Sequence, residues 1–249
     1  MRMVKEKKRF SEIGSIAMML CLIAVCGVAN ADLFVIRPTA STASSAPNSS
    51  MLPINTANGS GIDGTAAGFS DLSTGTLLTA EGIPVTADPQ KTTWNTTNSV
   101  NQNTMWLSGP ETFSGNTWIA FDLGDVYTVS SMHVWNYNYH VAPVSYQRGI
   151  KDLTVQYSDD NINWTNAENM TFAKANASTG YIGSDYALTT QITTQYIRFL
   201  ISSNYYADMV TNNIVGLQEV RFVGTTVPEP MTLAVLAIGG VGCLIRRKK

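Results

Sequence analysis

Two adjacent carboxylates are the first residues of this chain whose types suggest chemistry. Asp159 and Asp160 lie side by side in the segment YSDDNINW. Acid–base hydrolysis of a glycoside needs two carboxyl groups that face each other about 5–10 Å apart across the substrate, and adjacency does not establish that geometry. Between a strand pattern and Trp164, aspartate and asparagine favour a tight turn instead, in which their side chains hydrogen-bond to the backbone. We therefore predict a hairpin turn here.

The two histidines do not complete a recognisable catalytic set. His133 alternates with Met132 and Val134 in a strand-like segment, which predicts a position on the solvent-facing side of the strand. His140 lies in the irregular segment NYNYHVAPVSYQRG. No nucleophile signature such as G-x-S-x-G accompanies either residue, so the sequence does not support a Ser-His-Asp enzyme. We expect a protein that is not an enzyme, with a polysaccharide-acting hydrolase as the less favoured alternative.

Aromatic and polar side chains gather in two irregular segments and suggest a carbohydrate site. The first segment carries Tyr139, His140 and Arg148, and the second, SSNYYADM, carries Tyr205 and Tyr206. Sugar sites combine an aromatic platform for the apolar face of the ring with a few directional polar groups. We predict that these five residues contact a glycan. The alternative is that the tyrosines only pack the loops and that Arg148 pairs with a carboxylate to hold a turn.

The elements that must hold these segments are short β-strands. Apolar and polar residues alternate with a period of two, and no segment of the body shows a sustained helical stripe. The Ser/Thr-rich stretch Thr39–Ser50 is either a linker or an edge strand. The pattern predicts an all-β sandwich. Its expected strands include WIAFDLG, VSSMHVW, LTVQYS, YIRFLI and LQEVRFV.

Composition excludes several classes of site and partner. Cys21, Cys26 and Cys243 all lie in the terminal apolar segments, so the body has no disulfide, thiolate nucleophile or cysteine-based zinc site. Between Asp32 and Pro230 the chain has seven basic and 16 acidic residues, a net charge near −9. Nucleic-acid binding depends on clustered cations that neutralise phosphates, so we expect no nucleic-acid partner.

The N-terminus has the parts of a secretory signal peptide. A basic region precedes a mostly apolar stretch at residues 13–28, and Ala29-Asn30-Ala31 fits the small-x-small cleavage pattern. We predict a signal peptide over residues 1–31, with an uncleaved membrane helix as the alternative. A lead-in at residues 32–53 then precedes the folded domain.

The C-terminal segment combines a proline-containing break, a short apolar stretch and a basic tail. As a helix, residues 231–245 would span about 22 Å, less than the hydrocarbon core of about 30 Å. Basic residues stay on the cytoplasmic side, so the body between the two ends is predicted to be exported. The segment 225–249 resembles the PEP-CTERM sorting signal. The resemblance is carried by Val227, Pro228, Glu229, Pro230, Arg246 and Arg247.

This resemblance implies a route out of the cell. An exosortase-type membrane protease would recognise the tail after transient insertion of its short transmembrane helix into the inner membrane. The enzyme would then release the protein towards the cell surface or the extracellular exopolysaccharide matrix. A permanent membrane anchor is the alternative.

A second resemblance covers residues 54–224. Five segments are similar, in order, to the discoidin or coagulation-factor 5/8 type C domain. They are TWIAFDLG, MHVWNYN, RGIKDLTVQYSDDNINWT, QYIRFLI and VGLQEVRFVG. The resemblance implies a galactose-binding-like jelly roll, an eight-stranded two-sheet sandwich whose loops at one end bind sugars, phospholipid headgroups or protein ligands.

The same resemblance implies a structural calcium ion. In many galactose-binding-like domains a calcium ion joins an early aspartate loop to a glutamate near the last strand, and here Asp63 and Glu219 occupy these places. Carboxylates and loop carbonyls suit calcium, which takes six to eight oxygen ligands. The early loop departs from the common DG-x-x-x-T-x-W form, because the tryptophan that would match, Trp94 or Trp106, lies well downstream.

These observations predict an exported, non-catalytic module that is either carbohydrate-binding or adhesive, with a polysaccharide or a cell-surface glycan as its partner. The alternative is a structural matrix protein that recognises no small ligand.

Overall fold

The computed structural model describes the central part of the chain in seven segments. They are residues 32–59, 104–110, 113, 116–139, 145–177, 181–206 and 213–227. All of them except Asp32 belong to one of the chain's two structural units, Leu33–Lys249. Within these segments no helix is long and apolar enough to cross a membrane. The predicted signal peptide, and the predicted membrane segment at 231–245, lie outside them.

The described segments contain eight strands and two 3-10 turns. The strands are β1 (Phe34–Ile36), β2 (Ala40–Ala43), β3 (Trp106–Leu107), β4 (Thr117–Asn136), β5 (Asp152–Ser158), β6 (Thr165–Thr171), β7 (Ser184–Ile201) and β8 (Gly216–Thr226). The turns are η1 (Pro53–Thr56) and η3 (Ser145–Arg148). The paired strands run antiparallel.

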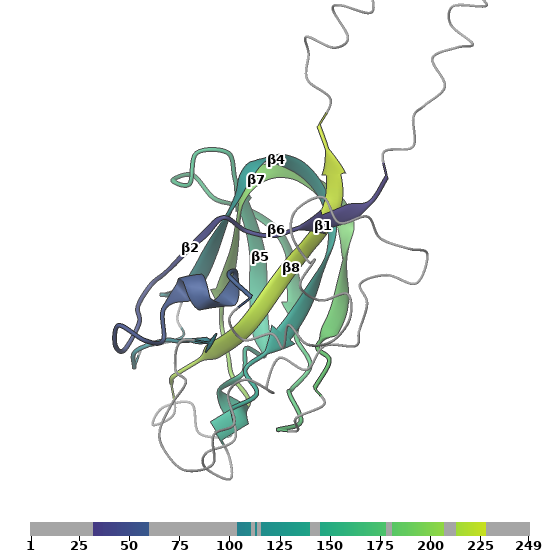
Figure 1. Cartoon of the computed structure of the whole chain (residues 1–249). Coiled ribbons are helices and arrows are strands. Elements are labelled where there is room, and N and C mark those ends of the chain that lie inside the picture. The colour runs from purple at the N-terminus through teal and green to yellow at the C-terminus, as the bar shows by residue number, and fades with distance from the viewer. Residues whose placement is uncertain are drawn as a thin grey trace, which may run out of the picture. The chain divides into compact units, whose positions relative to one another are not determined.

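Two long strands build both layers of the sandwich, because each of them bends once. The first half of β4 pairs with β2 and with the second half of β7; beyond Asp122 its second half pairs with β8 and the first half of β7. One layer thus contains β2, β5, β6 and one half each of β4 and β7, and the other contains β1, β3, β8 and the remaining halves of β4 and β7. Figure 1 shows both strands arching at the bend. Gly124 lies there with a φ of 86°, a left-handed conformation that favours glycine.

The core lies between the two layers and is centred on phenylalanine rings. Phe121 of one layer meets Phe222 of the other, with ring centroids 5.6 Å apart. Phe199 lies 5.2 Å from Phe121 and 5.4 Å from Phe172, and these contacts are edge-to-face. All four side chains are at most 1% exposed. The predicted all-β sandwich is confirmed, and the Ser/Thr-rich stretch contributes the edge strand β2.

The adjacent carboxylates form the predicted turn between β5 and β6. The Asp160 carboxylate accepts hydrogen bonds from the backbone N–H groups of Asn163 and Ile162, at 2.7 and 2.9 Å, and from the Ser158 hydroxyl at 2.9 Å. Asn161 has a φ of 58°, which asparagine tolerates in turns. Hydrogen bonds to the charged form, led by those from Asn163 and Ile162, lower the pKa of the Asp160 carboxyl.

We expect the variant Asp160→Asn to melt at a lower temperature than the wild type at neutral pH, and at a similar temperature in strong acid. The carboxyl pKa is lower in the folded chain than in the unfolded chain. Its stabilising contribution is therefore present above the ordinary pKa of 3.8 and disappears as the pH falls towards the folded value. Thermal unfolding of both proteins across the acid range measures this effect. A constant difference at every pH would contradict the prediction.

His133 is buried, so the prediction that it faces solvent was wrong. Its side chain is 1% exposed; Nδ1 lies 2.7 Å from Asp185 Oδ1, and Nε2 lies 2.9 Å from the Ile182 carbonyl oxygen. The imidazole also packs against Trp135, with ring centroids 4.2 Å apart. The segment before β7 covers this face of β4, and a Cβ at Gly183 would lie 2.7 Å from Nε2. Strand alternation alone does not reveal that a loop covers the outer face.

Candidate functional site

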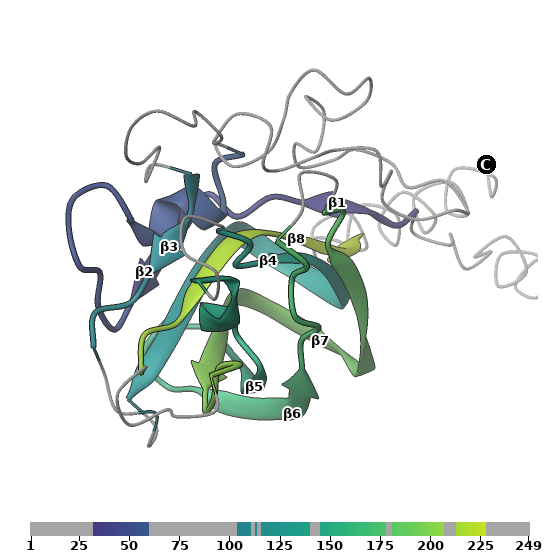
Figure 2. The ribbon, with the colours of Figure 1, turned by 90° about the horizontal axis from the view of Figure 1, so that it is seen from below.

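Side chains from four segments meet at one end of the sandwich, which we call the loop end. The backbone N–H of Tyr205 donates to the carbonyl of Gln147 at 2.8 Å, which ties the segment after β7 to η3. Figure 1 shows η3 below the strands, and Figure 2 views the molecule from this side. The loop end comprises Tyr137 and Tyr139 after β4, Tyr146 and Arg148 in η3, Lys174 after β6, and Tyr205 and Tyr206 after β7.

A buried asparagine positions the backbone of the loop end. The Asn136 amide nitrogen donates to the carbonyls of Ile150 and Ala173, at 2.7 and 2.9 Å. Its oxygen accepts from the backbone N–H groups of Tyr137 and Ile150, at 2.8 and 2.9 Å. A Cβ at Gly149 would lie 2.8 Å from this oxygen, so the close approach requires glycine. One side chain therefore joins the end of β4 to the segments that precede β5 and follow β6.

Tyr137 is a buried tyrosine at the loop end, and the Tyr139 ring lies next to it. Burial raises the pKa of the Tyr137 phenol, and Arg148 partly opposes this rise. Tyr139 and Tyr206 act electrostatically on the same phenol, and the ring centroids of Tyr137 and Tyr139 are 6.1 Å apart. The ring contact places Tyr139 beside Tyr137, and the effect of Arg148 on the pKa of the Tyr137 phenol indicates that its guanidinium lies nearby.

Lys174 brings a second cation to the loop end. Its Nζ lies 5.4 Å from the ring centroid of Tyr146 and 5.8 Å from that of Tyr205, within the range of cation–π contacts. The Tyr205 hydroxyl donates to the Phe172 carbonyl, which fixes the orientation of the ring. Lys174 could not be predicted from the sequence, because it lies in the irregular segment FAKANAS, which carries no periodic signal.

The structure brings four of the five predicted contact residues to the loop end. Each of the four is half-buried, which leaves part of each side chain accessible to a ligand. They are Tyr139, Arg148, Tyr205 and Tyr206. His140 lies outside the described residues, so its place at this end stays a prediction.

Glu219, the predicted calcium ligand, is buried in an ion pair with a neighbour on β8. Its carboxylate pairs with Arg221, and the two side chains are 0% and 2% exposed. The backbone N–H of Gly59 lies 3.3 and 3.2 Å from the two carboxylate oxygens. Burial raises the pKa of Glu219, and Arg221 opposes the rise. The pair thus joins β8 to the segment after η1.

In the described part of this region, the oxygen atoms near Glu219 accept hydrogen bonds from protein groups. Calcium takes oxygen ligands, and in this structure the Glu219 carboxylate accepts hydrogen bonds from Arg221 and from the Gly59 backbone N–H. The carbonyls of Ala57 and Asn58 accept from Arg37, at 2.9 and 2.6 Å. Within the described ranges no three His, Cys, Asp or Glu side chains gather as a metal site requires. Asp63, the other predicted ligand, lies outside these ranges, so calcium binding stays a prediction.

Part of this chain matches the model of a known protein family. Residues 91–199 match a NedA-like, galactose-binding domain of the F5/F8 type C group. The matched region contains β4, β5, β6 and most of β7, together with η3 and Lys174. No curated protein matches the chain.

Several solved structures resemble this chain at low identity. The CBM32 of AlyQ in complex with 4,5-unsaturated mannuronic acid is 18% identical, with 76% of this chain and 97% of that chain covered and a TM-score of 0.43. A chitosan-binding module of a chitosanase/glucanase from Paenibacillus sp. IK-5 is 18% identical, with coverage of 78% and 100% and a TM-score of 0.42. A fucolectin from striped bass serum is 15% identical, with coverage of 76% and 46% and a TM-score of 0.44.

Proposed function

We propose that this protein is a non-catalytic carbohydrate-binding module that contacts its glycan at the loop end. The observation that carries the proposal is the gathering of Tyr139, Arg148, Tyr205 and Tyr206, with Lys174, at one end of a rigid sandwich. Tyrosine rings offer an apolar platform for a pyranose, and the two cations donate hydrogen bonds to its hydroxyl or acidic groups. The galactose-binding family match over residues 91–199 supports the same ligand class.

The two ends of the chain support a proposal about where this binding takes place. The signal-like segment 1–31 and the PEP-CTERM-like segment 225–249 favour export, processing by an exosortase-type protease, and delivery to the cell surface or matrix. A carbohydrate-binding module would there hold the protein to polysaccharide. Mass spectrometry of both termini of the native protein tests this route, and two uncut termini would contradict it.

We expect Tyr139→Ala and Tyr205→Ala each to weaken glycan binding about tenfold, because each removes one aromatic contact to the sugar. A glycan array with the purified protein identifies the ligand, and calorimetric titration of that ligand compares the variants. Val126→Ser is the matched control, because Val126 is exposed at the bend of β4, away from the loop end. An array that is empty for the wild type, or variants that bind as the wild type does, would overturn the proposal.

A further inference from the structure

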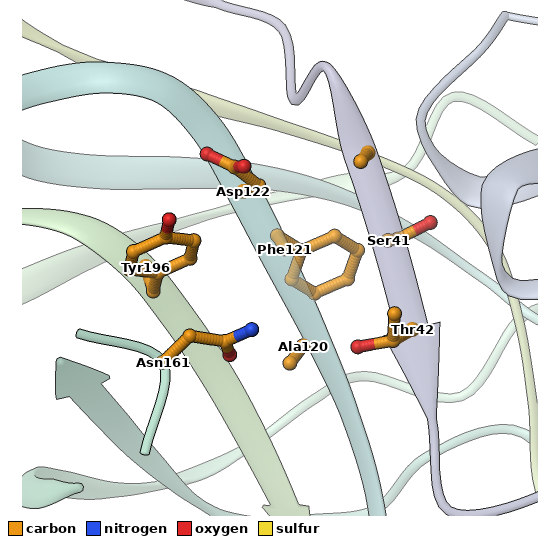
Figure 3. Close-up of a pocket in the computed structure, with 8 residues that line it drawn as sticks. Ser41, Thr42, Ala120, Phe121, Asp122, Asn161 and Tyr196 are labelled. Atoms are coloured by element: carbon orange, nitrogen blue, oxygen red, sulfur yellow. The ribbon is translucent and has the colours of Figure 1, made fainter. Parts of the chain in front are cut away.

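A shallow hollow with a mainly apolar floor lies on the outer face of the layer that contains β2, β4 and β7. It has a volume of about 230 Å³, below the roughly 300–1,000 Å³ of pockets for drug-sized ligands. Figure 3 shows its lining side chains on these strands and on the β5–β6 turn. We call it the outer hollow, and its lining residues are Ala40, Ser41, Thr42, Ala120, Phe121, Asp122, Asn161 and Tyr196.

The outer hollow exists because a small residue occupies the middle of β4. Ala120 pairs with Thr42 on β2 and with Arg198 on β7. The Arg198 guanidinium lies against two tryptophan rings, with Cζ 4.2 Å from the ring centroid of Trp164 and 5.8 Å from that of Trp118. Its Nε also donates to the Gln156 side-chain oxygen at 2.7 Å. These contacts hold the Arg198 side chain at tryptophan rings and at Gln156 on β5, and the Ala120 methyl group forms part of the floor of the hollow.

Polar groups surround this floor. The Asp122 carboxylate is fixed by hydrogen bonds to Oδ1 from the Gly124 backbone N–H, at 2.8 Å, and from the Gln195 amide, at 3.0 Å. These bonds leave Oδ2 able to accept from a ligand. Asn161 extends its side chain over the hollow from the turn that Asp160 stabilises (Figure 3).

Three further side chains of the hollow are available to a ligand. Across the described part of the chain, no hydrogen bond engages the side chains of Asn161, Tyr196 or Thr42. The amide of Asn161 offers a donor and an acceptor, and each hydroxyl offers both functions. The Tyr196 ring, on the residue paired with Asp122, adds an apolar surface to the hollow. An apolar patch ringed by amide, hydroxyl and carboxylate groups matches the two kinds of surface on a sugar ring.

We propose that the outer hollow is a second carbohydrate site, which takes one neutral hexopyranose unit of a polysaccharide. Its volume suits a single ring, and its open position on a sheet face lets the rest of the chain continue on either side. The Asp122 carboxylate accepts hydrogen bonds from sugar hydroxyl groups and repels the carboxylate of a uronic acid. The lining residues include no cation that would offset this repulsion, so uronic acids are disfavoured. The site shares only its ligand class with the proposed function and uses separate residues. Two sites on one domain raise the avidity for a long polysaccharide.

The test is a titration of the ¹⁵N-labelled protein with methyl β-galactopyranoside, methyl β-glucopyranoside and methyl β-glucuronide, followed by amide chemical shifts. We expect at least one neutral glycoside to shift the amides of Ala120 and Asn161, and the glucuronide to leave them unchanged. Tyr205→Ala should leave these shifts intact, which separates this site from the loop end. Shifts confined to the loop end, or none at Ala120 and Asn161 with either neutral glycoside, would overturn the proposal.

Two variants test the same site, so that the result does not depend on a single substitution that disturbs the fold. Asn161→Gly keeps the left-handed backbone, because glycine adopts it readily, and removes only the side-chain amide. We expect it to weaken binding at the hollow about fivefold, as for the loss of one hydrogen bond. Ala120→Phe fills the hollow with a residue that strands accept, and should abolish the shifts at Asn161. Unchanged affinity in both variants would contradict a site here.

Discussion

Replacing Arg221 with methionine is expected to lower the free energy of unfolding by about 3–5 kcal/mol, because it leaves the Glu219 carboxylate buried without its partner. Glu219 is 0% exposed, and Arg221 is the charged group in its ion pair. Burial raises the pKa of Glu219, so removal of Arg221 raises it further. The deficit should therefore shrink as the pH falls and the carboxyl becomes protonated. Urea unfolding of both proteins at several pH values measures the change.

A double variant is the control for this prediction. Substituting both partners, as in Glu219→Leu with Arg221→Met, removes the buried charges together and should restore much of the lost stability.

The same unfolding curves, recorded with millimolar calcium and with a chelator, test the calcium prediction. If Glu219 binds calcium, the metal will stabilise the wild type and rescue Arg221→Met. If the ion pair alone holds this region, calcium will change neither protein. A loss below about 1 kcal/mol in Arg221→Met would contradict the role of the pair.

We expect Asn136→Ala to lower the free energy of unfolding by roughly 3 kcal/mol, because it leaves buried backbone groups without their partners. The four hydrogen bonds of this side chain go to backbone groups of Tyr137, Ile150 and Ala173. These segments also carry the loop end, so glycan affinity should fall together with stability. Denaturant unfolding and calorimetric titration measure the two effects.

Asn169→Ala is the matched control, because the Asn169 side chain is exposed and accepts a single hydrogen bond from the Thr154 hydroxyl. Its effect on stability should stay within about 0.5 kcal/mol, and its glycan affinity should equal that of the wild type. Equal stability losses in the two asparagine variants would show that the Asn136 network does not carry the loop end.

Local patterns predicted much of this fold because their physical causes are local. Alternation in WIAFDLG and YIRFLI predicted strands, and both segments lie in strands, β4 and β7, because a strand directs successive side chains to opposite faces. The turn at Asp160 followed from hydrogen bonds within a few residues. Alternation was wrong at His133, because the burial of an outer face depends on a loop whose path the strand does not encode.

The sequence by itself determined the all-β class, the cysteine-free core, and most of the residues that reach the loop end. Only the tertiary structure decided that Lys174 joins them, that Glu219 pairs with Arg221, and that Ala120 lies under a hollow. Each of these depends on which strands become neighbours. The antiparallel register places Arg198 beside Ala120 and directs its guanidinium to Trp164. Contacts between residues far apart in the chain depend on the packing of the whole sandwich, and the pattern of any one segment does not contain them.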